Sequence, residues 1–281
     1  MELLDGKIVK KEVLESLKKD LSKIDRPLGL AVLQVGDDEA SNVYIGQKNK
    51  MADELGFDFR HFRLDENIPE EGLLGLIDGL NKDDRIDGIL VQMPIPEHLN
   101  PKTIQNSICY YKDVDGLTDQ NAGCLMHNVD GLVPCTPQGI MDLLEYYKIP
   151  VEGKNVTIVG RSDLVGKPLA SLMTNKNATV TLCHSKTKNL KLFTKNADIL
   201  VVAVGKAKLI KEDYVKKDAV IVDVGINRNE DGKLCGDVDF EDVKEKVSYI
   251  TPVPGGVGQM TVAELARNTY KAYCLRKSLN K

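Results

Sequence analysis

Four short apolar runs in the second half of the chain constrain its fold more than any other feature. They are NVTIVG, ATVTLCH, DILVVAVG and AVIVDVG, which begin at residues 155, 178, 198 and 219, with turn or helix signals between them. Strands buried on both faces of a parallel sheet have this continuous Val, Ile and Leu character. The series therefore predicts an α/β domain with a Rossmann-type, doubly wound parallel sheet.

The first half of the chain alternates helical and strand patterns. Apolar residues recur at helical spacing over 10–24, and an apolar run at 29–36 precedes a helix that we expect to run from an N-cap at Ser41 to Leu55 and to end at Gly56. Two further strands are indicated by FDFRHFRL and by DGILV, which is soon followed by two prolines. This half also predicts βαβ units around a parallel sheet.

A turn-rich stretch at 133–137 separates the two halves, and a helical pattern follows at about 139–147. The last helical pattern, over 261–276, is long enough to reach back onto the first half. We therefore predict two α/β domains. The first comprises 1–138 and is completed by a C-terminal helix at 261–281, and the second comprises 139–260.

The composition argues against several classes of protein. The 38 Lys and Arg against 42 Asp and Glu give a formal net charge of −4, which leaves no basic excess for a nucleic acid partner. No apolar run reaches the ~20 residues that span a bilayer, and the charged N-terminus lacks the pattern of a secretory signal, so we expect a cytoplasmic protein that binds no membrane. The six cysteines include no C-x-x-C pair, which favours reduced, mostly buried thiols over disulfides or a metal site.

The segment from 155 to 173 predicts a strand, a tight loop with Gly160 and Gly166, and a helix with Pro168 in its first turn. Backbone N–H groups at a helix N-terminus can bind phosphate, and glycines allow the close approach. The middle glycine of G-x-G-x-x-G is missing, so the alternative is a plain βα turn. The strands that follow favour a nucleotide site, because doubly wound sheets bind ligands at the carboxyl ends of their strands.

The end of the second strand of this domain predicts which nucleotide is bound. NAD-binding sheets carry an Asp or Glu there for the ribose hydroxyls. This chain has His184, Ser185, Lys186 and Lys188 instead, and Arg161 in the glycine loop could form a bidentate contact with a phosphate. Each residue alone could belong to a solvated loop, but together they favour NADP over NAD.

A lysine in the helix after Ser41 lies on an unexpected face. Tyr44, Lys48, Met51 and Leu55 are spaced by four, three and four residues, which places Lys48 on the apolar stripe. A lysine surrounded by apolar groups has a lowered pKa and can transfer protons near neutral pH, although its ammonium could instead reach solvent. Y-x-x-x-K is also typical of short-chain dehydrogenases, but there it follows the nucleotide-binding strands on the same domain, so we reject that interpretation.

Three other segments carry candidate site residues. Gln92 ends an apolar strand, where α/β sheets place their sites. Asp113 and Asp115 flank a turn at which a carboxylate either caps local N–H groups or accepts paired donors from a heterocycle. The segment 254–258, PGGVG, is either a hinge or a place where the backbone approaches a ligand closely.

Taken together, these segments resemble bifunctional methylenetetrahydrofolate dehydrogenase/methenyltetrahydrofolate cyclohydrolase, the FolD family. The resemblance covers nearly the whole chain and includes SNVYIGQKNKMADELG, DGILVQMPIP, KDVDGLT, PCTPQGI, VGRSDLVGKP, ATVTLCHSKT, VDVGIN, GDVDF and TPVPGGVGQMT, in that order. It implies two α/β domains with a cleft between them, a C-terminal helix that returns to the first domain, and a homodimer. It also implies oxidation of 5,10-methylenetetrahydrofolate by NADP+ and then hydrolysis of the methenyl product to 10-formyltetrahydrofolate, a step of one-carbon metabolism.

The resemblance also implies residue roles. Lys48 matches the catalytic lysine, Gln92 the glutamine that orients it, Tyr44 the tyrosine that stacks on folate, and Asp115 the aspartate that holds the pterin. Tyr44, Gln92 and Asp115 then bind the substrate as well as serving catalysis. The segment Pro254, Gly255 and Gly256 completes the substrate site. The implied NADP contacts are Gly160, Arg161, Ser162, Gly166, His184, Ser185, Gly205 and Ile226.

One departure from the family pattern is Gln259, which stands where proline usually follows PGGVG and puts folate affinity in question. Two alternatives therefore stay open. One is an NADP-dependent dehydrogenase acting on another flat cyclic amine without a hydrolase step. The other is a protein that binds NADP or folate without turnover. The presence of Lys48 and Gln92 argues against both.

Overall fold

The computed structural model describes residues 1–229 and 231–279, which form two compact units. Residues 1–12 and 136–261 make one unit, here called the six-strand unit, and residues 13–135 and 262–281 make the other, the three-strand unit. Residues 280 and 281 of the predicted C-terminal segment lie outside the described residues. The helices α1 (Gly6–Leu21), α6 (Cys135–Tyr146) and α10 (Val257–Leu279) contain residues of both units.

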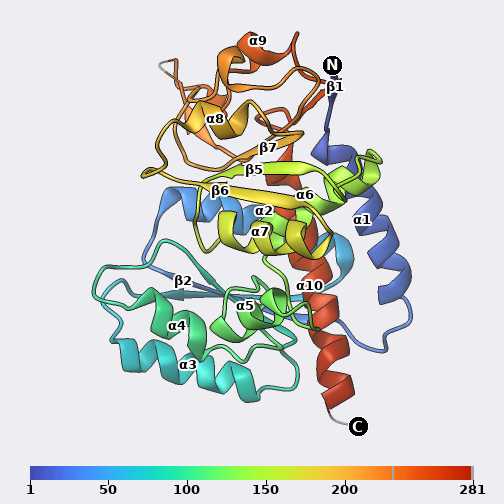
Figure 1. The fold of residues 1–281 in the computed structure, drawn as a ribbon. Helices are drawn as coiled ribbons and strands as arrows, with labels where there is room; N and C mark the ends of the chain where they lie inside the picture. Colours follow the sequence, from blue (N-terminus) through green and yellow to red (C-terminus); the bar gives the residue numbers. More distant parts are fainter. Residues whose placement is uncertain (230, 280–281) are drawn as a thin grey trace. The chain divides into compact units, whose positions relative to one another are not determined.

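The main sheet of the six-strand unit is wholly parallel, with the order β1-β11-β8-β7-β5-β6. After β6 the chain crosses to the other side of β5, so the topological switch point lies between β5 and β7 (Figure 1). This is the predicted doubly wound arrangement, and its core combines side chains of the apolar runs with others from the connecting segments, such as Ile210, Val238 and Val243. The elements are β1 (Glu2–Leu3), β5 (Asn155–Val159), α7 (Gly166–Asn175), β6 (Thr179–Cys183), α8 (Leu190–Thr194), β7 (Ile199–Val202), η1 (Glu212–Tyr214), β8 (Val220–Asp223), α9 (Phe240–Val243) and β11 (Tyr249–Ile250).

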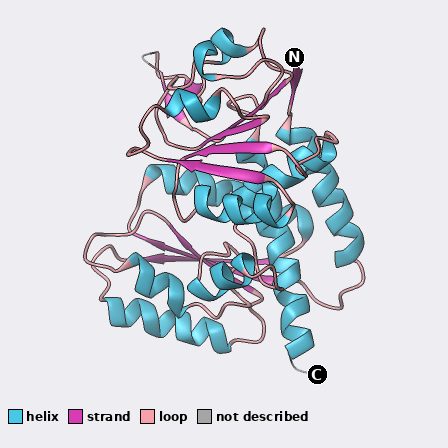
Figure 2. Ribbon diagram, in the orientation of Figure 1, coloured by secondary structure: helices cyan, strands magenta, loops and turns pink. Residues whose placement is uncertain are grey.

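Two features of this unit do not follow from local patterns. The predicted domains place residues 1–12 with the first domain, whereas β1 pairs with β11 and brings these residues into the six-strand unit. After β8 the chain also forms a small antiparallel pair from β9 (Asn227–Arg228) and β10 (Leu234–Cys235). Figure 2 shows both sheets in magenta.

The three-strand unit contains a parallel sheet of order β3-β2-β4, formed by β2 (Gly29–Val35), β3 (Asp58–Leu64) and β4 (Gly88–Gln92). One face packs on α3 (Glu70–Lys82) and α4 (Pro101–Ser107) through an apolar cluster, while α2 (Glu39–Leu55) covers the other face (Figure 1). The chain again reverses its strand order at β2, so β2 and β4 flank a second switch point. A bridge from Ile89 to Asp113 extends the sheet beyond β4, and α5 (Asp119–Met126) follows.

The helix boundaries correct three expectations. Asp38, not Ser41, is the N-cap of α2, because its carboxylate accepts the Ser41 N–H at 2.7 Å. Gly56 ends α2 in the left-handed conformation, as predicted, with φ 70°. The last three residues of the turn-rich stretch, 135–137, already belong to α6, which begins at Cys135, and α10 begins at Val257, four residues before the predicted start.

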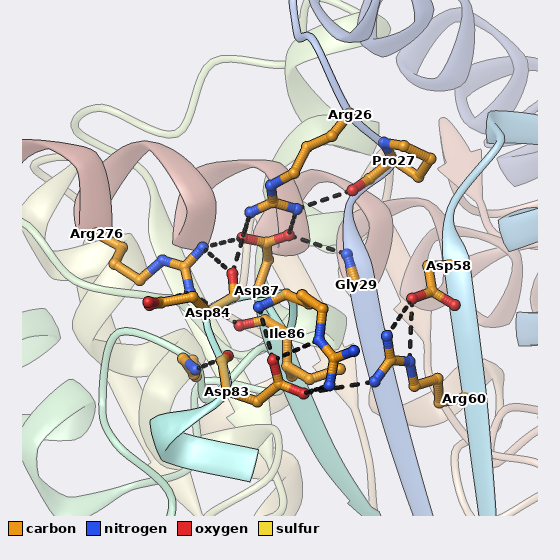
Figure 3. A network of polar contacts seen from close by, with 12 residues as sticks. Arg26, Pro27, Gly29, Asp58, Arg60, Asp83, Asp84, Ile86, Asp87 and Arg276 are labelled. Carbon is orange, nitrogen blue, oxygen red and sulfur yellow. Dashed lines mark hydrogen bonds and ion pairs between the residues drawn. The ribbon is translucent and has the colours of Figure 1, made fainter.

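A buried carboxylate ties the end of α10 to the sheet of the three-strand unit. Asp87 is 1% exposed and accepts hydrogen bonds from Arg26, from Arg276 and from the Gly29 N–H, as Figure 3 shows. Since two guanidinium groups compensate one buried charge, this pair of contacts avoids the large penalty of an unpaired ion. The network therefore fixes Arg276, near the end of the chain, beside the start of β2 and β4.

Candidate active site

Lys48 lies on α2 with its side chain directed at the carboxyl end of β4. It is half-buried, and its Nζ donates a hydrogen bond to Gln92 Oε1 at 2.8 Å. Burial lowers the pKa of Lys48, and the nearby Asp115 and Cys135 oppose that shift. A lowered lysine pKa enlarges the fraction of neutral amine available for proton transfer.

Gln92 has a defined orientation because it is bonded at both ends of its amide. Its Nε2 donates to the Met93 carbonyl at 2.7 Å, which leaves Oε1 facing Lys48. The partner of Lys48 is thus a neutral acceptor, so it holds the amine without the pKa increase that a carboxylate would bring.

The start of α2 is fastened to both strands beside it. The Ser41 hydroxyl lies 2.8 Å from Asp38 and 3.3 Å from the Met93 carbonyl, which follows β4. Gln34, buried on β2, donates to Asn42 Oδ1 at 2.9 Å. These contacts hold the helix that carries Lys48 against the switch point.

The two aspartates of KDVDGLT have different surroundings. Asp113 is fully buried and accepts from the Thr118 N–H at 2.7 Å, from Asn121 Nδ2 at 2.9 Å and from Gln105 Nε2 at 3.1 Å, so it organises the turn. Asp115 is half-buried, and burial raises its pKa while the charge of Lys48 opposes the increase. Asp113 therefore caps local N–H groups, one of the two predicted roles. Asp115 interacts electrostatically with Lys48.

Cys135 is a site residue that the sequence analysis missed. Its buried Sγ lies 3.3 Å from the Val114 carbonyl and 3.8 Å from Asp115 Oδ1. Asn268 of α10 donates to the Val114 carbonyl at 2.9 Å and contacts the sulfur at 3.7 Å. Burial and the charge of Asp115 raise the Cys135 pKa well above its usual value, so the thiol stays neutral. The only sequence signal was its place in PCTPQGI.

The predicted apolar stripe on α2 is wrong in one respect. Tyr44 is 44% exposed, whereas Ser41, Ile45 and Ala52 are buried. The buried face is thus rotated toward Ile45, because the residues on that side pack on the sheet. Tyr44 lies one turn before Lys48, and its side chain is exposed to solvent.

The glycine loop of the six-strand unit follows β5 at the switch point. Gly160 has φ 125°, and a Cβ there would overlap the Ala203 carbonyl, while a Cβ at Gly166 would overlap the Gly160 carbonyl. Helix α7 begins at Gly166 and has no side-chain cap. The Lys167 N–H donates to the Ser162 carbonyl at 3.1 Å and Pro168 has no N–H, so within this first turn Gly166 offers the N–H for an anion. The glycines thus allow strand, loop and helix to pack closely, as a phosphate loop requires.

The residues expected to recognise the 2′-phosphate are available for it. Arg161 and Ser185 are exposed, as are Lys186 and Lys188. Ser162 is also exposed, and its Oγ accepts the Val165 N–H at 3.1 Å, which leaves its hydroxyl proton free to be donated. This mixture of cationic and hydroxyl groups fits the extra phosphate of NADP.

The remaining predicted cofactor residues lie at the ends of β6, β7 and β8. His184 is half-buried in a turn in which its Nδ1 accepts the Lys186 N–H at 3.2 Å. Gly205 follows β7 with φ 65°, and Ile226 follows β8 with 52% of its surface exposed.

The segment 254–256 packs against the start of the chain. The Gly6 N–H donates to the Gly255 carbonyl at 3.0 Å, and a Cβ at Gly6 would overlap the Gly256 carbonyl. Gly255 has φ 116°, a conformation that favours glycine. The close approach that the glycines allow is therefore to α1, an explanation that the sequence analysis did not consider. Gln259 donates its N–H to the Gly256 carbonyl at 3.1 Å, a bond that proline could not form.

Other site chemistry is limited within the described part of the chain. No group of three His, Cys, Asp or Glu residues there is arranged to hold a metal ion, and no described helix is long and apolar enough to span a membrane.

All six cysteines are free, but the expectation that most of them are buried is wrong. Only Cys135 and Cys183 are buried, Cys274 is exposed, and the other three are intermediate.

The doubly wound sheet and the open glycine loop at its switch point define a two-unit α/β protein of the NAD(P)-binding class. Two family models specify this further. One, described as the catalytic domain of tetrahydrofolate dehydrogenase/cyclohydrolase, matches residues 4–115, and the other, its NAD(P)-binding domain, matches residues 134–277. The chain belongs to the tetrahydrofolate dehydrogenase/cyclohydrolase family, which confirms the predicted family and enzyme class.

Individual relatives agree with this assignment. The bifunctional protein FolD of Ligilactobacillus salivarius is 50% identical over 270 residues, 95% of each chain. The crystal structure of the bifunctional enzyme from Campylobacter jejuni matches with a TM-score of 0.96 at 48% identity, covering 98% of this chain and 99% of that one. The Trypanosoma brucei enzyme, complexed with NADP cofactor and an inhibitor, matches with a TM-score of 0.92 at 32% identity, over 99% and 98%. These structures confirm the predicted fold class.

Proposed function

We propose that this chain oxidises 5,10-methylenetetrahydrofolate to the 5,10-methenyl cation with NADP+ and then hydrolyses that cation to 10-formyltetrahydrofolate. Family membership supports both activities. The observation that carries the hydrolytic step is the contact between Lys48, whose pKa burial lowers, and the neutral acceptor Gln92. The enzyme thus belongs to one-carbon metabolism.

In the oxidation step, NADP+ accepts a hydride from the methylene carbon when it is bound. The protein needs no acid for this step, because the lone pair of a folate nitrogen expels the hydride, so its task is alignment. Gly160, Gly166 and the α7 N-terminus bind the pyrophosphate, and Arg161, Ser162, His184 and Ser185 hold the adenosine end with its 2′-phosphate. Gly205 and Ile226 complete the site on the side of the nicotinamide.

The hydrolysis requires proton transfer. Water adds to the methenyl carbon and loses a proton; the bond from this carbon to N5 then breaks as N5 gains a proton, and the hydroxyl proton leaves to give the formyl group on N10. The net reaction consumes one water and releases one proton. Lys48 accepts and returns protons in this sequence, while Gln92 holds its amine in place.

The remaining substrate contacts follow from the surroundings of each residue. Tyr44 offers an exposed ring face on which a pterin can stack, one turn from Lys48. Asp115 accepts paired N–H donors from the pterin, because its neighbour Asp113 already serves the turn. For the segment 254–256, which packs on α1, the role in the substrate site is supported by the family resemblance.

The domain roles and the assembly belong to this proposal. The predicted folate-binding catalytic domain corresponds to the three-strand unit, 13–135 with 262–281, and the predicted NADP-binding domain corresponds to the six-strand unit, 136–261 with 1–12. The resemblance to the family supports a homodimer, and the net charge of −4 supports the absence of a nucleic acid partner. The charged N-terminus and the lack of a membrane-spanning apolar run in the sequence support a cytoplasmic protein without a membrane partner.

A time course with purified protein, methylenetetrahydrofolate and NADP+ tests the function. NADPH should accumulate together with a methenyl intermediate that converts to the formyl product. A reaction that stops at the methenyl stage would support a dehydrogenase alone, and ligand binding without NADPH formation would support a sensor.

A further inference from the structure

Two buried aspartates at the carboxyl ends of the six-strand sheet are not used by the proposed reaction. Asp237, which follows β10, is 0% exposed, and Asp223, the last residue of β8, is 4% exposed. Buried carboxylates are destabilising unless hydrogen bonds replace their hydration. The partners of these two carboxylates therefore indicate what they do.

Asp237 binds the chain segment that follows β7. Its Oδ2 accepts the N–H groups of Val204 at 2.7 Å and Gly205 at 3.1 Å, and its Oδ1 accepts the Lys206 N–H at 2.8 Å. Three consecutive N–H groups can point at one carboxylate because Gly205 adopts φ 65°. Its Oδ1 also accepts Asn227 Nδ2 at 2.9 Å, which ties the segment after β8 to the same group.

Asp223 binds the chain on either side of Asp237. Its Oδ1 accepts the N–H groups of Gly225 at 3.0 Å and Asp237 at 2.9 Å, and its Oδ2 accepts the Val238 N–H at 2.9 Å. The carboxylates also occupy space that side chains would need, since a Cβ at Gly236 would overlap Asp223 and a Cβ at Gly225 would overlap Asp237. Asp223 thus places Asp237, and Asp237 places the two segments.

We infer that Asp237 and Asp223 are positioning residues for the cofactor, because they fix the backbone segments 204–206 and 225–227 at the carboxyl ends of β7 and β8. This rests on the proposed function, in which these segments carry Gly205 and Ile226 on the nicotinamide side. Ligands of doubly wound sheets bind at these strand ends. Charge-assisted hydrogen bonds to backbone N–H groups hold such segments more firmly than neutral ones.

Asp237→Asn tests the inference, because the new amide would point N–H groups at backbone N–H groups. The NADP+ dissociation constant, measured by calorimetry, should rise about tenfold or more. Hydrogen exchange at the amides of 204–206 in the nucleotide-free protein should accelerate. The cyclohydrolase rate with methenyltetrahydrofolate and no nucleotide should stay within about twofold of wild type, because water addition consumes no cofactor.

Asp198→Asn is the matched control. Asp198 lies in the same unit just before β7, at the opposite strand ends, where it accepts the Asn155 N–H at 2.9 Å and pairs with Lys216. Its loss should leave NADP+ affinity unchanged. Should Asp237→Asn fail to fold, Asn227→Ala removes one donor, and a rise of about threefold in the NADP+ dissociation constant with unchanged cyclohydrolase activity is then expected.

The outcomes are distinguishable. Unchanged NADP+ affinity or unchanged amide exchange in Asp237→Asn would overturn the inference. An equal fall of the dehydrogenase and cyclohydrolase activities would also overturn it, because it would indicate a general structural role. If Asn227→Ala has to decide, unchanged NADP+ affinity in that variant would overturn it. If the wild-type protein itself fails to oxidise methylenetetrahydrofolate with NADP+, the proposed function fails instead.

Discussion

Lys48 is held by an amide where many buried lysines are held by a carboxylate. An ion pair would stabilise the ammonium and raise the lysine pKa, while burial beside Gln92 lowers it. Helical spacing marked Lys48 and a strand end marked Gln92, but that the two residues meet was implied by the family resemblance alone. Cys135 was not predictable, because a lone cysteine in the sequence looks like any core thiol and its contact with Asn268 joins residues 133 positions apart.

Gln92→Glu should place a carboxylate beside Lys48 and raise the pKa of its amine. Less free amine then remains near neutral pH, so the pH–rate profile of the cyclohydrolase should move to higher pH, by about one pH unit or more. Dehydrogenase activity should change much less. A profile that coincides with that of the wild type would show that the amine is not the titrating group.

Arg161→Ala should separate the two nicotinamide nucleotides. The exposed guanidinium suits the 2′-phosphate, which NAD+ lacks. The KM for NADP+ should therefore rise by about tenfold, and any KM for NAD+ should hardly change. Equal increases for both nucleotides would place Arg161 at the pyrophosphate or outside the site.

Asp223 should make stability depend on pH. Burial and the neighbouring Asp237 raise its pKa to about 6, against the opposing N–H groups of Gly225, Asp237 and Val238. The folded pKa lies above the unfolded value of about 3.9, so this group favours folding at low pH and loses that contribution as the pH rises through about 6.

Asp223→Asn removes this titration. The free energy of unfolding of the wild type minus that of the variant should therefore fall by about 2 kcal/mol between about pH 4 and pH 7. Urea unfolding at several pH values measures it. A difference that stays constant with pH would contradict the raised pKa.

At the scale of elements, long apolar runs were predictable and short strands were not. Strands β5, β7 and β8 are recognisable in the sequence because both of their faces are buried, and the partly buried edge strand β6 also lies in an apolar run. Strands β1, β9, β10 and β11 have two residues each and exist through long-range pairing. The start of α2 was misplaced because Asp38 and Ser41 are both good caps, and only the structure shows which one accepts the other's N–H.

Asp38→Ala should weaken the start of α2. The loss of a side-chain cap costs about 1 kcal/mol, and the Ser41 hydroxyl loses its partner as well. Because this helix carries Lys48, cyclohydrolase activity should fall by several-fold. Denaturant unfolding and the hydrolysis rate check the two effects, and a stability equal to that of the wild type would argue against the cap.

At the scale of the whole molecule, the residues assigned to the two reactions lie largely in different compact units. Lys48, Gln92 and Asp115 belong to the three-strand unit, and the predicted NADP contacts belong to the six-strand unit. The two α/β units followed from the sequence. The placement of residues 1–12 did not, because it depends on the pairing of β1 with β11. Because the two sets of residues lie in different units, we predict that the cyclohydrolase activity can be lost while the dehydrogenase activity remains.

Lys48→Met gives the most direct test of that claim, since it removes the amine and leaves an unbranched side chain of similar length. With methylenetetrahydrofolate and NADP+, the variant should form NADPH and accumulate the methenyl cation, with almost no enzymatic conversion to the formyl product and an unchanged circular dichroism spectrum. Formyl product appearing at the wild-type rate would contradict the account.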